Sequence, residues 1–305
     1  MRGLTPWREA RDRLLRDHGL AAKDLLGAGD EAEVYALGAD RVLKIDKPAV
    51  DRALTGRRRA LYAALDRSAV PFAVPGILDI GESHGVGWSL ETRIAAQCFA
   101  DLLPRLKGPA RQRALLSYAD AAAEVRKLRY TQVGPHQAAY GEVLAADAIR
   151  ADSWADFVLA RAGACLAAAR DRVAGLVDRP ERALDRLAQW LAGCGPTSPD
   201  LVHGDFYPAN LLTDAQGTVT GLLDFGPLTL MGDATLDLAG AVLYLTGMEG
   251  VVAADRGVVR ERAREHGLGD GDLAIGRLFL AFRLLSTTRD GQFRWCADVI
   301  RSACD

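Results

Sequence analysis

The fold is decided by LVHGDFYPAN at residues 201–210 and by DFG at residues 224–226. The first stretch carries Asp205 and, five residues later, Asn210; Asp224 follows fourteen residues after that. Residues 201–203, 210–212 and 219–224 are short apolar runs separated by turn-forming residues, a pattern that predicts short strands joined by tight turns. These three polar side chains should therefore be presented by loops at the ends of strands.

This spacing predicts phosphoryl transfer to a hydroxyl group. The reaction needs one carboxylate beside the acceptor hydroxyl, to orient it and take its proton, and Asp205 fits that role. It also needs oxygen ligands that hold Mg²⁺ against the triphosphate, because this hard cation prefers oxygen; Asn210 and Asp224 fit that second role. We interpret His203 as a hydrogen-bonding brace of the loop, and Asp237 as an acceptor for its backbone amides.

Three blocks occur in order, namely HGDFYPAN at 203–210, DFG at 224–226 and GDATLDLA at 232–239. They resemble the aminoglycoside phosphotransferase family, the small-molecule branch of the protein-kinase-like fold that also includes choline and fructosamine kinases. The third block departs from the family pattern only at Ala234, where proline is usual. Gly204, where protein kinases usually have arginine, favours the small-molecule branch. Ordinary surface turns would explain a single aspartate, but they explain three ordered blocks poorly.

The resemblance covers about residues 20 to 300 and implies a bilobal, protein-kinase-like α+β fold. We expect residues 1–93 to form a small antiparallel β-sheet lobe that covers the nucleotide. Residues 94–305 should form a larger, mainly helical lobe with the catalytic loop and the acceptor site. The pattern of the sequence agrees, because strand signals dominate the first region, whereas alanine, leucine and arginine at helical spacing dominate after residue 95.

Residues 27–34, GAGDEAEV, resemble the glycine-rich loop of kinases. Gly27 and Gly29 would let backbone N–H groups approach phosphates without a side-chain collision. A dinucleotide-binding loop must open a helix, but residues 33–37 alternate like a strand, so a hairpin is predicted. Lys44 on the third strand matches the family lysine that contacts the α- and β-phosphates; a solvent-facing lysine at a strand edge is the alternative.

The helix predicted over residues 49–66 should offer a glutamate to orient Lys44, but it contains none. Asp51 is the only early carboxylate in it, and its shorter side chain would demand a closer helix. The stretch where the glutamate is expected holds three consecutive arginines instead: Arg57, Arg58 and Arg59.

The resemblance implies ATP or GTP as the phosphoryl donor and Mg²⁺ as the cofactor. It places the hinge, whose backbone pairs with the adenine edge, at Glu91, Thr92 and Ile94. Backbone recognition leaves little side-chain signature, so this placement depends on the resemblance. The sequence has no G-x-x-x-x-G-K-[ST] phosphate loop, which excludes the other large class of ATP-using folds.

The acceptor implied by the resemblance is a small molecule with a hydroxyl group, and foremost an antibiotic such as an aminoglycoside, which would make the enzyme a resistance factor. A metabolic kinase of a sugar, amino alcohol or glycated amine is one alternative, and a catalytically silent binding module is another. The acidic run at 140–156 could be a solvated helix face or an acidic wall for a polycationic acceptor. The arginines and aromatic residues of 279–301 suit a neutral or partly anionic acceptor at least as well.

Composition excludes several other classes. The 305 residues carry a net charge of −2, so a strongly basic nucleic-acid binder is not expected. The five cysteines are widely spaced and never form C-x-x-C, which argues against a disulfide framework or a zinc knuckle. The N-terminal residues lack the apolar segment of a signal peptide, and the apolar run at 238–248 is too short to span a bilayer. We therefore expect a cytoplasmic protein without a membrane partner; the sequence does not specify its oligomeric state.

Overall fold

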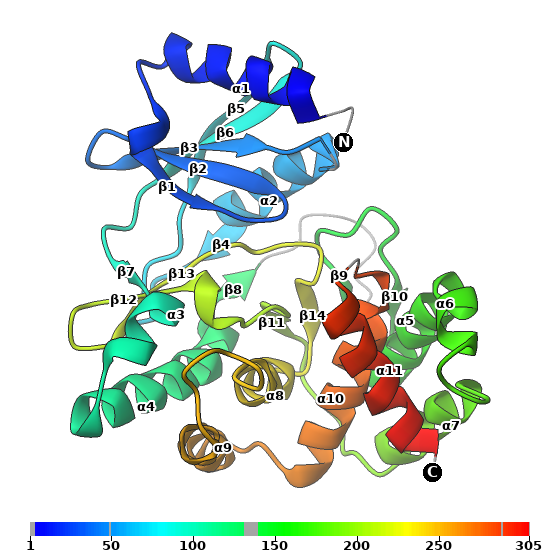
Figure 1. Cartoon of the computed structure of the whole chain (residues 1–305). Coiled ribbons are helices and arrows are strands. Elements are labelled where there is room, and N and C mark those ends of the chain that lie inside the picture. The colour runs from blue at the N-terminus through cyan, green and yellow to red at the C-terminus, as the bar shows by residue number, and fades with distance from the viewer. Residues whose placement is uncertain (1–3, 49, 131–139, 288, 305) are drawn as a thin grey trace.

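The computed structural model describes residues 4–48, 50–130, 140–287 and 289–304. The chain folds into two lobes: a small one built on a five-stranded antiparallel sheet, and a larger one that is mainly helical (Figure 1). The predicted bilobal α+β class is confirmed.

The small lobe follows the predicted order of elements closely. Its sheet has the strand order β1-β2-β3-β6-β5, and every neighbouring pair is antiparallel. Because β1 pairs with β2 as a hairpin across the glycine-rich turn, the dinucleotide-binding alternative is excluded. The elements are α1 (Leu4–Asp17), η1 (Ala22–Asp24), β1 (Leu25–Ala28), β2 (Ala32–Leu37), β3 (Arg41–Asp46), α2 (Arg52–Ala64), β5 (Ile77–Ser83) and β6 (Val86–Thr92).

The two helices of this region pack in different directions. Helix α1 covers one face of the sheet, where Trp7, Leu14 and Leu15 join the cluster that contains Leu43 and Ile45 (Figure 1). Helix α2 instead contributes its buried residues to the core of the helical lobe. The apolar stripe of α2 therefore ties the sheet to the region that carries the catalytic loop.

The helical lobe is organised around α8, which packs against α4, α9 and α10. Six of the ten residues of α8 are buried and apolar or glycine between Leu236 and Val242, a pattern typical of a central helix. No described helix is both long enough and apolar enough to cross a lipid bilayer. The helices are α3 (Phe99–Leu102), η2 (Leu103–Arg105), α4 (Gly108–Glu124), η3 (Val125–Lys127), α5 (Trp154–Ala168), α6 (Arg170–Ala174), α7 (Glu181–Ala192), η4 (Pro208–Asn210), α8 (Thr235–Tyr244), α9 (Ala253–Glu265), α10 (Asp270–Arg283), η5 (Leu284–Ser286) and α11 (Asp290–Cys304).

Short strands line the side of the helical lobe that faces the sheet. The three strands predicted there are present as β11 (Asp200–Val202), β12 (Leu211–Thr213) and β13 (Val219–Leu222). Others were not predicted, because strands of two or three residues are too short to show a two-residue period. These are β4 (Leu65–Asp66), β7 (Gln97–Cys98), β8 (Arg129–Tyr130), β9 (Tyr140–Glu142), β10 (Arg150–Ala151) and β14 (Leu230–Gly232).

Candidate active site

The catalytic loop follows β11 and is held by two buried side chains. Asp237 of α8 accepts hydrogen bonds from the backbone nitrogens of His203 (2.8 Å) and Gly204 (2.9 Å). The ring of His203 bonds the Leu223 carbonyl oxygen through Nε2 (2.8 Å) and accepts from the Asp205 backbone nitrogen through Nδ1 (3.3 Å). Burial raises the pKa of Asp237 to about 6, although both amide bonds oppose the shift. The predicted roles of His203 and Asp237 as braces are confirmed.

Gly204 has a steric reason to be glycine. Its φ is +78°, and an added Cβ would lie 2.0 Å from the Leu228 carbonyl oxygen. Any side chain at this position would have to displace the segment that follows DFG. The residue read as a mark of the small-molecule branch is therefore required by the packing of the loop.

Asp205 is oriented by the amide of Asn210. Asn210 Nδ2 donates to the Asp205 backbone oxygen (3.0 Å) and to its Oδ2 (3.3 Å). Burial raises the pKa of Asp205, and the negative charge of Asp224 adds to the shift, against the opposing charge of His203. Asp205 therefore holds a proton more readily than an exposed aspartate, which suits a group that must accept one.

Asp224 is the point where the two lobes meet. It adopts a φ of +65°, in the left-handed region that a non-glycine side chain rarely occupies. Lys44 Nζ of β3 donates to its Oδ1 (2.8 Å), and Arg58 Nη2 of α2 lies 3.6 Å from the same oxygen. Burial favours the protonated form, but the charges of Lys44 and Arg58 outweigh it and hold the pKa of Asp224 well below its usual range. This carboxylate is ionised.

Of the predicted site residues, the structure brings together Lys44, Asp205, Asn210 and Asp224. The carboxylate that contacts Lys44 is Asp224. Asp51 instead caps α2, accepting from the Ala53 backbone nitrogen (3.0 Å), and pairs with Arg57 (2.7 Å).

The predicted glycine-rich turn lies on the exposed edge of the sheet. Gly27 falls in β1 and Gly29 in the turn, where its backbone nitrogen donates to the Ala32 carbonyl oxygen (2.9 Å). Within the described part of the chain, no heavy atom lies within 4 Å of where a Cβ would stand at either glycine. Space beside the backbone is thus available at both positions.

The predicted hinge residues lie at the junction of the sheet and the following segment. Glu91 is buried in β6 and accepts from Ser89 Oγ (2.8 Å). Thr92 gives its backbone N–H to the Gly76 carbonyl oxygen (2.9 Å), and Ile94 packs over Gly221. Their role in adenine recognition stays a prediction.

A cavity of about 280 Å³ opens between the lobes and is lined by both Asp205 and Asp224. Three further charged residues line it, Glu31, Arg58 and Arg283, and of these Arg58 had been given no role in the site. For Arg58 a signal was present. It stands at the spacing of Leu54, Leu61 and Tyr62, which form the buried stripe of α2.

The carboxylates of the acidic run at 140–156 lie in two different environments. Glu142 lies in β9 with 3% of its surface exposed, and it pairs with Arg161 and with Arg283 Nη2, the latter at 3.2 Å. Asp147 also pairs with Arg161 (3.1 Å). Because Glu142 neutralises buried arginines, the acidic-wall interpretation is wrong, whereas Asp156, exposed on α5, agrees with a solvated helix face.

The residues present fit a magnesium ion bound together with phosphates. Among the described residues, no group of three His, Cys, Asp or Glu side chains is placed to hold a metal. Mg²⁺ in nucleotide sites usually takes only one or two protein ligands, and substrate phosphates and water complete its shell. Asn210 donates through Nδ2, which leaves Oδ1 as its ligand atom beside the carboxylate of Asp224.

Comparison with protein families agrees with this geometry. The model described as the phosphotransferase enzyme family matches residues 25–272. The chain belongs to this family. It is accordingly an enzyme, a small-molecule phosphotransferase that acts on hydroxyl groups. Comparison with curated proteins finds no matching relative.

Solved structures of aminoglycoside phosphotransferases share the fold over nearly the whole chain. A thermostable mutant of APH(4)-Ia, in a ternary complex with ADP and hygromycin B, is 21% identical with a TM-score of 0.68, covering 96% of this chain and 97% of the other. ADP-bound APH(2'')-Ib is 15% identical with a TM-score of 0.62, covering 97% of each chain. The GDP and kanamycin complex of APH(2")-IIia is 18% identical with a TM-score of 0.56, covering 92% and 91%. These likenesses establish the protein-kinase-like fold predicted from the sequence.

Proposed function

We propose that this phosphotransferase moves the γ-phosphoryl group of ATP or GTP to a hydroxyl group of an antibiotic, with Mg²⁺ as cofactor, and thereby confers resistance. Residues 1–93 cover the nucleotide, and residues 94–305 carry the catalytic loop and the acceptor site. The reaction runs in the cytoplasm, where nucleoside triphosphates are made. The observation that carries the proposal is the meeting of Asp205, Asn210 and Asp224 with Lys44 beside one cavity.

Each of these side chains has one task. Asp205 orients the acceptor hydroxyl and takes its proton as the oxygen attacks phosphorus, while the nucleoside diphosphate leaves. Its carboxylate is held in place by Asn210 Nδ2 at 3.3 Å, so little reorganisation is needed on binding. Lys44 neutralises phosphate charge from the sheet side. Asn210 and Asp224 would hold Mg²⁺, which would offset the charge that develops on the phosphates.

Known complexes support an antibiotic acceptor. Two of the related structures named above hold an antibiotic together with a nucleotide: hygromycin B with ADP, and kanamycin with GDP. Because these structures hold an adenine or a guanine nucleotide, both ATP and GTP are supported as donors for this enzyme.

A metabolic kinase acting on a neutral or anionic acceptor is the second candidate. It is favoured by the wall around Arg283, whose buried guanidinium bonds the carbonyl oxygens of Leu228 (2.7 Å) and Pro227 (3.2 Å) and pairs with Glu142, so that neither charge is left unpaired there. The carboxylate nearest to it, Glu142, is already neutralised. A polycationic acceptor would find little acidic surface at this end of the cavity.

An acceptor screen tests the proposal. The protein is incubated with Mg²⁺, ATP or GTP, and each of three panels: aminoglycosides, neutral hydroxyl-bearing antibiotics, and sugars with amino alcohols. Each product is scored for a mass increase of one phosphoryl group, and Asp205→Asn serves as the negative control. Transfer to an antibiotic supports the proposal, and transfer confined to the metabolic panel supports the second candidate. No transfer to any acceptor, with nucleotide binding intact, would make the protein a binding module.

A further inference from the structure

Arg58 stands apart from the other arginines of α2 because it is buried. Only 3% of its surface is exposed, and its Nε donates to the Phe225 carbonyl oxygen of the DFG segment at 2.9 Å. The neighbouring arginines reach other parts of the chain: Arg57 Nε donates to the Leu144 carbonyl oxygen (2.9 Å), and Arg59 Nη2 donates to the Leu78 carbonyl oxygen (3.3 Å). Of the three, Arg58 alone lines the cavity that holds Asp205 and Asp224.

One nitrogen of the Arg58 guanidinium lacks a hydrogen-bond acceptor among the described residues. This nitrogen, Nη2, is buried. Two carboxylates are near enough for charge attraction, Asp224 Oδ1 at 3.6 Å and Glu31 Oε2 at 3.5 Å, but neither accepts a hydrogen bond. A buried guanidinium N–H without an acceptor is costly, so proteins keep such a group mainly where something else completes its bonding.

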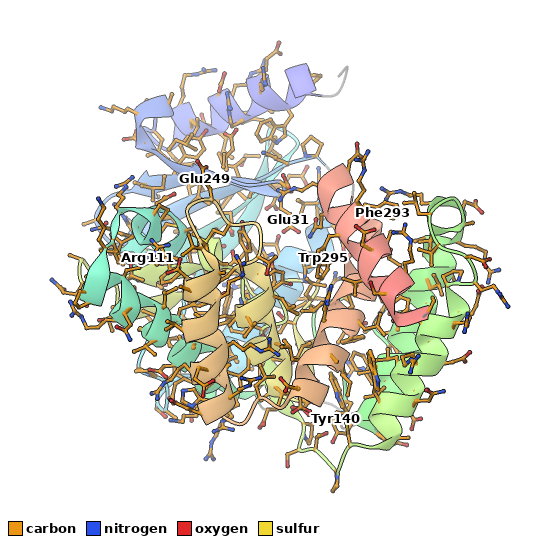
Figure 2. All side chains as sticks on the ribbon, turned by 60° about the horizontal axis from the view of Figure 1, so that its bottom comes forward. Glu31, Arg111, Tyr140, Glu249, Phe293 and Trp295 are labelled. Atoms are coloured by element: carbon orange, nitrogen blue, oxygen red, sulfur yellow. The ribbon has the colours of Figure 1, made fainter. Side chains whose placement is uncertain are left out.

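The groups around Arg58 Nη2 indicate what kind of ligand accepts its hydrogen bond. Glu31 belongs to the glycine-rich turn and lies beside the amino-terminal end of α11, between the sheet and the helices (Figure 2). Lys44 donates to the same oxygen of Asp224 that Arg58 approaches. Two cations thus converge on one carboxylate under the turn that should cover phosphates. The planar fork of a guanidinium suits phosphate oxygens particularly well.

We propose that Arg58 is a donor-binding residue, which holds the DFG backbone through Nε and donates from Nη2 to a phosphate oxygen of the nucleotide. This inference rests on the proposed function, because it assumes a nucleoside triphosphate in the cavity. Helix α2 would then contribute a positive charge to the polyphosphate directly, at the place where a glutamate was expected to orient Lys44. Lys44 is oriented by Asp224 instead.

Separate binding of the two halves of the nucleotide tests this role. Inorganic tripolyphosphate with Mg²⁺, and adenosine alone, are titrated calorimetrically into the whole protein and into Arg58→Gln. The variant should bind tripolyphosphate roughly 10- to 100-fold more weakly, the usual worth of a hydrogen bond to a charged group. Its affinity for adenosine should be unchanged. The matched control is Arg59→Gln, because Arg59 is the next residue of α2 and its side chain is half-exposed. This variant should leave both affinities unchanged.

A second variant covers the case in which Arg58→Gln fails to fold. Arg58→Lys keeps the charge beside Asp224 but loses the fork, so it should bind tripolyphosphate more weakly than the unaltered protein while adenosine binding stays constant. A purely structural Arg58 would instead give unchanged tripolyphosphate binding, or equal losses for both probes; either result overturns the proposal. If the unaltered protein transfers phosphate while Arg58→Gln binds tripolyphosphate normally, only this inference fails. If the unaltered protein binds no tripolyphosphate, the proposed function fails with it.

Discussion

The catalytic loop and the glycine-rich turn face one cavity but are held in opposite ways. The catalytic loop is fixed from several sides, by Asp237, by His203, and by the hydroxyl of Tyr118, which donates to the Phe206 carbonyl oxygen at 2.8 Å. In the turn, the contact with the helical lobe is an ion pair between Asp30 and Arg289, whose side chains are 76% and 67% exposed. Exposed pairs of this kind contribute only about 0–1 kcal/mol.

The difference follows from the two tasks. A group that moves a proton must already be in position when the acceptor arrives, whereas a cover over the nucleotide must open for exchange. Substitutions in the fixed region should therefore change turnover, and those in the turn should change nucleotide binding. Four experiments test this contrast.

The largest effect is expected at Asp224. Asp224→Ala removes the proposed metal ligand and leaves Lys44 and Arg58 without the carboxylate they share, so turnover should fall below detection while the protein stays folded. Activity assays and circular dichroism check the two statements. Asp79→Ala, an exposed carboxylate on β5, is the control and should be fully active. An active Asp224→Ala protein would remove this residue from the site.

Asp205→Asn should come next. The amide can still accept from Asn210 Nδ2 but cannot take a proton, so turnover should fall by about 10²–10⁴, the usual worth of a positioned base. The dissociation constant for nucleotide should stay within about twofold, because Asp205 is proposed to act on the acceptor and not on the phosphates. Near-normal turnover would refute the assignment of Asp205 as the base.

Asp237→Asn probes the brace behind the loop. One of the two backbone N–H groups that Asp237 now satisfies would face an NH₂ group, which should lower the free energy of unfolding by about 1–3 kcal/mol. Turnover should fall roughly tenfold as the loop loses its position. Urea denaturation and steady-state kinetics measure both quantities. If stability and turnover were both unchanged, the loop would owe its position to other contacts.

Gly29→Ala should have the smallest effect. No atom of the described structure meets the added methyl group, so the melting temperature should not fall, but the methyl would stand between the backbone and a phosphate. The KM for nucleotide should rise by about two- to tenfold with kcat little changed. Gly163→Ala in α5 is the control, since it also meets no atom. An unchanged KM would place the phosphates away from the turn.

Local spacing explains how much of this site could be predicted from the sequence. The pattern of strands and turns was enough to group Asp205, Asn210 and Asp224, because all three lie within twenty residues of the sequence. The pairing of Lys44 with Asp224 joins residues 180 positions apart and depends on how the lobes pack, which no local pattern encodes. Arg58 was noted only as one of three arginines where a glutamate was expected, although its place on the apolar stripe of α2 already indicated burial. Glu142 was misread because its partners lie on two distant helices.

Gly204 has a consequence for regulation. Protein kinases commonly order their activation segments by pairing a phosphorylated side chain with arginines. Here the backbone that follows DFG lies so close that no side chain fits at position 204, and an arginine cannot be accommodated there without rebuilding the loop. Steric crowding therefore excludes regulation in which an arginine at position 204 binds a phosphorylated side chain.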